Sequence, residues 1–271
     1  MRATIFTIPK PFTDPLIKLV QINAITSWTK LGADFDVILM GDEPGISELA
    51  QSLKIKQIKE IKKNEFGTPL LSSAFRLARE QSQAEILIYA NADIIFTDEL
   101  IEVLRRLPQN DFIAAGRRWD LELKELINFN DAGWRNNLID QIKKNGRLHP
   151  PTGIDYYIFP RQQLADLPDF AVGRVGWDNW VIFQAKKKKI RLIDLSADLT
   201  VIHQTHGYPA FNKGAARKTN PEAEKNKALA RKTSRIYNLN DADYLMISGQ
   251  LKKNYFRWFS FLKRYIKYRL R

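Results

Sequence analysis

Two polar side chains follow a continuous apolar run of the chain. Residues 86–90 read Ile-Leu-Ile-Tyr-Ala, and Asn91 and Asp93 come directly after them. Such a run is typical of a strand buried on both faces, and open α/β sheets bind ligands at the carboxyl ends of their strands. An acidic side chain there can hold a divalent cation and, through it, a diphosphate. A plain turn is the alternative interpretation, because Asn and Asp are common in turns.

Two of the three histidines, His203 and His206, lie at the end of a second strand-like segment that begins near Leu199. Neutral imidazole is a good ligand for divalent metals, so either ring can complete a cation site begun by Asp93. A structural role, with both rings hydrogen-bonded to the backbone, is the alternative.

A further carboxylate stands between indole rings, in the segment Gly-Trp-Asp-Asn-Trp at 176–180. Asp178 there comes just before a helix that we predict over 179–187, where capping is the commonest role of Asp. The rings of Trp177 and Trp180 also suit a sugar, since the C–H face of a sugar stacks on an indole and its hydroxyls need acceptors. Capping and sugar binding both remain open from the sequence.

An alternation of strand and helix patterns must position these side chains. It predicts a parallel sheet with right-handed crossovers, in which the loops after Ile8, Met40 and Ala90 lie at one sheet edge. Asp14 is expected to cap the first helix. The strands are predicted at 3–8, 36–40, 54–58, 86–90, 111–116, up to 160 and from 199, and the helices at 14–31, 46–53 and 70–83.

Several classes of protein are excluded or lowered in rank. The chain has no Cys, which excludes disulfides, thiolate metal sites and a Cys nucleophile. It has no Gly-x-Gly-x-x-Gly after the first strand, no P-loop and no Ser nucleophile elbow, which disfavours hydride transfer and ordinary ATP hydrolysis. Neither a signal-peptide pattern nor a long apolar run occurs, so we expect a cytoplasmic protein without a membrane span.

Most of the net charge of +13 belongs to the C-terminal region. Its last segment, 250–271, begins at Gln250, ends at Arg271 and interleaves aromatic with cationic residues. Helical spacing there predicts an amphipathic helix with one aromatic and one basic face, which suits an anionic membrane surface. Packing on the main domain is the first alternative, and nucleic-acid binding is the least favoured. The aromatic face is expected to consist of Leu251, Tyr255, Trp258, Leu262 and Tyr265.

Together these segments resemble a GT-A fold glycosyltransferase of the family 2-like kind. The strings Asn-Glu-Phe-Gly-Thr-Pro-Leu-Leu, Asn-Ala-Asp-Ile, Gly-Arg-Arg-Trp-Asp, His-Pro-Pro-Thr-Gly-Ile-Asp-Tyr and Gly-Trp-Asp-Asn-Trp are similar to a group of largely uncharacterised bacterial glycosyltransferases. The resemblance covers roughly residues 1–230. It implies an α/β fold of the Rossmann-like, nucleotide-diphospho-sugar transferase type: a mixed, mostly parallel sheet flanked by helices. We therefore expect a GT-A domain at 1–235, with a nucleotide-sugar-binding half (1–97) and an acceptor or catalytic half (98–235), followed by a basic aromatic tail at 236–271.

The resemblance also implies roles for single residues. The metal-binding Asp-x-Asp motif of the family matches Asn91-Ala92-Asp93, so only Asp93 carries over as an ionic ligand and Asn91 is expected to contact ribose. His203 or His206 would complete the metal site. Asp178 resembles the catalytic base, although Trp177 stands where the family has a second acidic residue. The remaining implied contacts are Thr7, Ile8, Pro9, Lys10 and Asp42 with the nucleotide, Arg76 with the diphosphate, and Asp155, Trp177 and Trp180 with the acceptor.

These roles predict transfer of a sugar from a nucleoside diphosphate sugar to a hydroxyl of a lipid-linked or glycan acceptor. The predicted cofactor is Mn²⁺ or Mg²⁺ and the predicted outcome is inversion, with the tail on the inner face of the cell membrane. The alternatives are a retaining glycosyltransferase, a nucleotidyltransferase, and a non-catalytic sugar-binding or membrane-associated protein.

Overall fold

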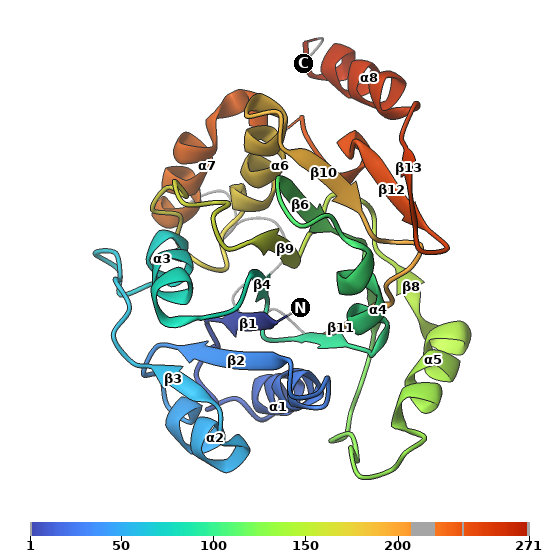
Figure 1. The fold of residues 1–271 in the computed structure, drawn as a ribbon. Helices are drawn as coiled ribbons and strands as arrows, with labels where there is room; N and C mark the ends of the chain where they lie inside the picture. The colour runs from blue at the N-terminus through green and yellow to red at the C-terminus, as the bar shows by residue number, and fades with distance from the viewer. Residues whose placement is uncertain (1, 207–219, 235, 270–271) are drawn as a thin grey trace.

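The computed structural model describes residues 2–206, 220–234 and 236–269, so the last two residues of the predicted tail, Leu270 and Arg271, lie outside the described part. A nine-stranded sheet runs through the molecule in the order β13-β12-β10-β6-β9-β4-β1-β2-β3 (Figure 1). Its strands are β1 (Ala3–Thr7), β2 (Phe35–Met40), β3 (Lys56–Ile58), β4 (Ile86–Ala90), β6 (Phe112–Ala115), β9 (Tyr156–Pro160), β10 (Arg191–Asp194), β12 (Tyr244–Ile247) and β13 (Gln250–Lys253).

The sheet is mostly parallel. β4, β1, β2 and β3 are parallel neighbours, and so are β6, β10 and β12. β9 is antiparallel to both β4 and β6, and β13 is antiparallel to β12. The predicted fold class, a mixed and mostly parallel sheet flanked by helices, is confirmed.

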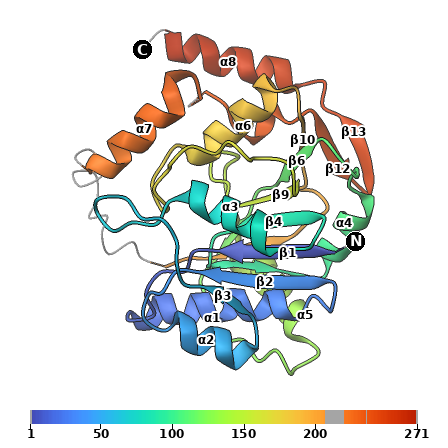
Figure 2. The same cartoon turned by 60° about the vertical axis from the view of Figure 1, so that its left-hand side comes forward.

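Helices cover both faces of this sheet (Figure 2). Successive side chains of a strand point to opposite faces, so Ile88 packs in one apolar core and its neighbours Leu87 and Tyr89 pack in the other. The first core contains α1 (Pro15–Thr29), α2 (Ile46–Leu53), α4 (Glu99–Arg106) and α5 (Trp134–Asn145), and the second contains α3 (Leu71–Gln81), α6 (Trp177–Lys187) and α7 (Pro221–Ser234).

The beginning of α1 follows the sequence prediction. The Asp14 carboxylate accepts the backbone N–H groups of Leu16 and Ile17, both at 2.9 Å. A side-chain acceptor of this kind satisfies donors that have no partner inside the helix. Asp14 is therefore the N-cap of α1, as predicted.

A second, four-stranded sheet lies against the same face as α1 and α5. It consists of β5 (Ile94–Phe96), β11 (Val201–Gln204), β7 (Trp119–Leu121) and β8 (Arg147–Leu148), in that order. β11 is antiparallel to β5 and parallel to β7. Only β11 was predicted, because strands of two or three residues are too short to produce a period in the sequence.

The helix of the C-terminal region begins later than predicted. Ser248 (φ 52°) and Gly249 (φ 74°) form a tight turn that folds β13 back onto β12, since two positive φ angles match the twist of a hairpin. Leu251 therefore lies in β13, and the helix α8 begins only at Arg257 and runs to Arg269. None of the helices within the described residues combines the length and the apolar character that crossing a membrane requires.

Candidate functional site

Three predicted loops meet at one edge of the main sheet. β2, β1 and β4 are adjacent and parallel, so the residues after Thr7, Met40 and Ala90 lie side by side. The predicted convergence of these loops is confirmed. Asp93, just beyond β4, faces the two histidines of β11 and its following loop.

Asp93, His203 and His206 form a compact cluster. The Nε2 atoms of His206 and His203 lie 3.0 and 3.7 Å from Asp93 Oδ2. One ligand atom of each of the three residues lies within 4.8 Å of the others, and this spacing fits a single metal ion. The strand register brings these residues together, because His203 pairs with Ile94, the residue after Asp93.

One oxygen of Asp93 lacks a hydrogen-bond partner among the described residues. Oδ1 is buried and accepts no hydrogen bond from any described residue. Burial by itself raises the pKa of Asp93, but the hydrogen bond with His206 and the charges of His203, His206 and Lys10 outweigh it and lower this pKa to about 2. The carboxylate is thus ionised at neutral pH. A buried acceptor without a donor is costly, so this oxygen suits a bound cation.

A second carboxylate orients the His203 ring. On the other side of β11, His203 pairs with Asp120 of β7, and the Asp120 Oδ1 to His203 Nδ1 distance is 3.0 Å. Burial lowers the pKa of His203, which favours the neutral ring. The Nδ1–H group then donates to Asp120, and the lone pair of Nε2 points toward Asp93. Around metal sites, a carboxylate commonly accepts the N–H group of a histidine ligand in this way, and it thereby fixes the tautomer of the ring.

Asp120 belongs to a buried network that sequence reasoning missed. It also accepts hydrogen bonds from Arg118 Nε at 3.1 Å and, through Oδ2, from His149 Nδ1 at 2.7 Å. Gly153 leaves room for the His149 ring, since a Cβ atom on residue 153 would stand 2.6 Å from His149 Nε2. The strings Gly-Arg-Arg-Trp-Asp and His-Pro-Pro-Thr-Gly contained these residues, but nothing in them indicated that they meet.

Arg118 extends the network to Asn91 and Asp155. Its guanidinium forms an ion pair with the Asp155 carboxylate. Asn91 Nδ2 donates to Asp155 Oδ1 at 2.7 Å, and the Asn91 backbone N–H donates to the Asp155 carbonyl at 2.8 Å. The Asn91 side chain is thus held by Asp155. The roles predicted from the sequence, ribose contact for Asn91 and acceptor contact for Asp155, stay predictions.

Asp178 occupies the second position of α6, whose N-cap is Gly176 with φ 110°. Burial raises the pKa of Asp178 to about 6, against the lowering effect of backbone hydrogen bonds and of the Arg118 charge. The Arg118 charge acts on the pKa of His203 as well as on that of Asp178. A carboxyl group with a pKa near neutral can exchange a proton at physiological pH.

The two tryptophans around Asp178 are buried. Trp177 is 6% exposed and packs edge-on against Tyr89 and Tyr157, and Trp180 is 7% exposed and packs against Phe170. Little ring surface therefore remains for stacking with a sugar. The acceptor contacts predicted for Trp177 and Trp180 stay predictions.

The other predicted contacts differ in exposure. Thr7, Ile8, Pro9 and Ala92 are buried around the loops, whereas Lys10 is exposed and its charge acts on Asp93. Asp42 and Arg76 are exposed and form surface ion pairs, Asp42 with Lys59 at 3.6 Å and Arg76 with Glu80 at 2.7 Å. Their nucleotide and diphosphate contacts stay predictions.

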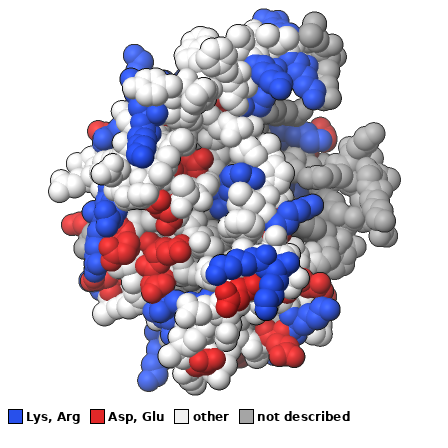
Figure 3. All heavy atoms as spheres, turned by 90° about the vertical axis from the view of Figure 1, so that its right-hand side faces the viewer, with Lys and Arg blue, Asp and Glu red and all other residues white. Residues whose placement is uncertain are grey.

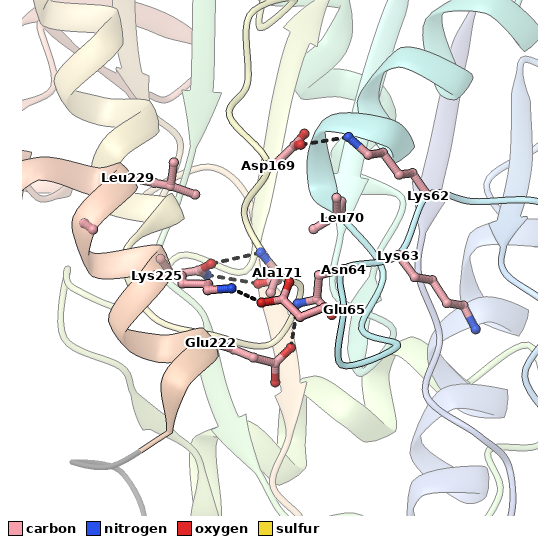
Figure 4. Close-up of a pocket in the computed structure, with 12 residues that line it drawn as sticks. Lys62, Lys63, Asn64, Glu65, Leu70, Asp169, Ala171, Glu222, Lys225 and Leu229 are labelled. Atoms are coloured by element: carbon pink, nitrogen blue, oxygen red, sulfur yellow. Dashed lines mark hydrogen bonds and ion pairs between the residues drawn. The ribbon is translucent and has the colours of Figure 1, made fainter.

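A hollow of about 630 Å³ opens elsewhere, between the loop before α3 and the helix α7 (Figure 4). Three of its lysines are engaged in ion pairs with carboxylates: Lys62 with Asp169, Lys63 with Glu43 and Lys225 with Glu65. None of the residues predicted for the site lines this hollow. Its charges are balanced internally, so it indicates no particular ligand.

Comparisons with known proteins bear on the fold. No protein-family model and no curated protein sequence matches the chain. Among solved structures, TarS 1-349 of S. aureus, in complex with UDP-GlcNAc, matches with a TM-score of 0.53 and 13% identity, over 98% of this chain and 73% of that one. The mannosyltransferase PcManGT from Pyrobaculum calidifontis, in complex with GDP-Man and Mn²⁺, has a TM-score of 0.48 and 15% identity, over 77% of this chain.

The chain spans 58% of the length of PcManGT, and we base the fold assignment on the TarS match. That match agrees with the mostly parallel sheet between helices described above. The chain therefore has the GT-A fold of nucleotide-diphospho-sugar transferases.

Proposed function

We propose that this protein is a glycosyltransferase, which moves a sugar from a nucleoside diphosphate sugar to an acceptor hydroxyl. The observation that carries the proposal is the buried cluster of Asp93, His203 and His206 at the carboxyl end of β4. In an α/β sheet this edge is where nucleotides bind. The fold alone would leave the activity open, because one fold supports many reactions.

The cluster fits a divalent cation. It offers one carboxylate with an unpartnered buried oxygen among the described residues and two imidazole rings. Imidazole suits transition metals better than Mg²⁺, which prefers oxygen ligands, so the donor set favours Mn²⁺ over Mg²⁺. When bound, such a cation would neutralise charge on a departing diphosphate.

Asp178 is the general base of the proposal. With a pKa of about 6 it is ionised at neutral pH and still basic enough to take the proton of the acceptor hydroxyl. A base that activates the acceptor directly corresponds to a single displacement, so we propose inversion at the anomeric carbon. The buried Trp177, packed on Tyr89 and Tyr157, fixes the first turn of α6 and with it the position of Asp178.

The donor is tested by thermal unfolding of the protein with nucleoside diphosphates and their sugars, each with and without Mn²⁺ or Mg²⁺. UDP-GlcNAc stands first in the panel, because TarS was solved with it. A ligand that binds only the native state stabilises it by about 2.7 kcal/mol at a hundredfold excess over Kd. We expect a cation-dependent rise in melting temperature with one nucleotide, and no rise with any member of the panel would contradict the proposal.

Asp93→Asn provides the matching variant, because it keeps the size of the side chain and removes the charge. It should lose the cation-dependent rise. Asp198→Asn is the control, since Asp198 is a half-buried carboxylate that accepts the N–H groups of Ser248 and Gly249 in the β12–β13 turn. An equal rise in parent and Asp93→Asn would exclude Asp93 as a ligand. The released product separates the reaction classes: nucleoside diphosphate supports sugar transfer, whereas pyrophosphate would indicate a nucleotidyltransferase.

A further inference from the structure

The helix α8 contacts the rest of the protein through its polar side. Arg257 forms an ion pair with Asp243, and Arg264 forms one with Asp241. Arg264 Nε also donates to the Ile236 carbonyl at 2.8 Å. These arginines share a helix face with Phe261, whose ring lies 5.1 Å from that of Tyr237. The charged residues of this face are thus paired with carboxylates of the main domain.

The opposite side of α8 and the residues just before it are apolar and exposed. Phe256 is 79% exposed, Phe259 76% and Trp258 69%. Tyr255, Leu262 and Ile266 continue this outward surface, which we term the aromatic ridge. A helix on the surface of a domain normally buries its apolar side and exposes its charges. The arrangement here is the reverse, and a contiguous exposed apolar surface of this kind marks an interaction site.

Cations surround the aromatic ridge. Lys252 and Lys253 of β13 are exposed before it, and Lys263, Lys267 and Arg269 are exposed along its flanks. No acidic residue follows Asp243 in the sequence. The partner of this surface must therefore be apolar in its interior and negatively charged at its boundary.

We propose that the aromatic ridge binds the surface of an anionic lipid bilayer, with its aromatic side chains among the acyl chains and its lysines at the headgroups. This proposal is independent of the proposed glycosyl transfer. The 13 residues of α8 span about 20 Å and carry several charges, so the helix would lie in the plane of the surface. Each lysine near an anionic surface strengthens this attraction.

The charged and apolar residues of this surface argue against two other partners, a second copy of the chain and a nucleic acid. A second copy of the chain would bring two sets of lysines together without any acidic residue between them. A nucleic acid would pair with the lysines, but it would leave Leu262 and Ile266 without an apolar phase. On the face that Figure 3 shows, basic and acidic side chains are interspersed. The cations around the aromatic ridge therefore do not continue into a basic band across this face.

Vesicle sedimentation tests the proposal with the full chain. We expect binding to vesicles of phosphatidylcholine with about a third phosphatidylglycerol, and at least tenfold weaker partitioning into phosphatidylcholine alone. Trp258→Ser with Phe259→Ser should lower the partition coefficient at least tenfold. The matched control is Phe66→Ser, which removes an exposed ring (51%) from a loop far from α8 in the sequence and should leave partitioning unchanged.

The charges are tested separately. Lys263→Glu with Lys267→Glu should also weaken partitioning at least tenfold. The control is Lys18→Glu with Lys144→Glu, which makes the same change of net charge at exposed sites on α1 and α5. Equal losses in the two double variants would show that only net charge matters and would overturn the proposal.

Fluorescence supplies a readout that does not depend on sedimentation. Trp258 is the most exposed of the six tryptophans, so its emission should shift to shorter wavelength on vesicle binding, and Trp258→Phe should abolish the shift while binding persists. Three results would overturn the proposal: no binding to anionic vesicles, a dimer in solution that Trp258→Ser with Phe259→Ser dissolves, or binding to an oligonucleotide alone.

Discussion

The site around Asp93 and the helix α8 leave opposite kinds of group without a partner. At the site, carboxylates and imidazoles converge in a largely buried place, and one carboxylate oxygen has no donor among the described residues. At α8, Arg257 and Arg264 are paired with carboxylates of the domain and the aromatic rings of the ridge lie exposed. A buried acceptor without a donor calls for a cation, and an exposed apolar surface calls for an apolar phase. In each region, the chemistry of the groups that lack a partner therefore indicates the class of partner.

The largest effect is expected at Asp178. Asp178→Asn removes the proposed base, and we expect turnover to fall by about 10² to 10⁴. The parent should gain activity as the pH rises through about 6, because the base acts in its ionised form and Asp178 ionises there. The variant should lose this pH dependence and should bind Mn²⁺ and vesicles as the parent does. Turnover within about threefold of the parent would rule out the assignment.

The next largest effect is expected at Asp120, whose carboxylate accepts a hydrogen bond from the His203 ring. Asp120→Asn keeps an acceptor for the Nδ1–H group but removes the charge that makes the ring a better ligand. We expect affinity for Mn²⁺ alone, measured by titration calorimetry without nucleotide, to fall by about 10 to 100-fold. Asp198→Asn is again the control, and unchanged affinity in Asp120→Asn would limit Asp120 to a structural role.

The smallest effect concerns the docking of α8. Arg264→Met leaves the Asp241 carboxylate buried without its cation, and we expect the free energy of unfolding to fall by about 1–3 kcal/mol. Burial already raises the pKa of Asp241, and the loss of Arg264 raises it further. The loss of stability should therefore shrink as the pH falls from 8 to 5, because a raised pKa brings protonation of the buried carboxyl group closer to neutral pH.

Urea unfolding at the two pH values measures this loss. Arg105→Met is the matched control, because the Arg105–Glu102 pair is exposed and should contribute less than about 1 kcal/mol. A loss for Arg264→Met no greater than that of the control would mean that α8 contributes little to the stability of the domain. Vesicle binding should survive in both variants, since the aromatic ridge is intact.

The sequence predicted those parts of the fold whose pattern lies within one short segment. The strands β1, β2 and β4 are apolar runs that end in polar loops, and Asp14 precedes a helical pattern as a cap does. Asp93, His203 and His206 were predicted as metal ligands from residue type and their places after strands, and the structure brings them together.

The rest of the site depends on pairing between distant segments. Asp120 reaches His203 only through the register of β7 with β11, and β7 has three residues. The ring environment of Trp177 likewise depends on Tyr89 and Tyr157, which come from other strands. In the tail, helical spacing continued through Leu251, but the positive φ angles of Ser248 and Gly249 reversed the chain before the helix began.

The two outermost strands of the main sheet have a further consequence. β3 and β13 are three and four residues long, and they carry exposed lysines at Lys56, Lys252 and Lys253. An unpaired strand edge is a template for joining another sheet, and short edges with lysines discourage this because the charge would have to leave water. Copies of this protein crowded side by side can therefore meet at these edges without merging their sheets into an aggregate.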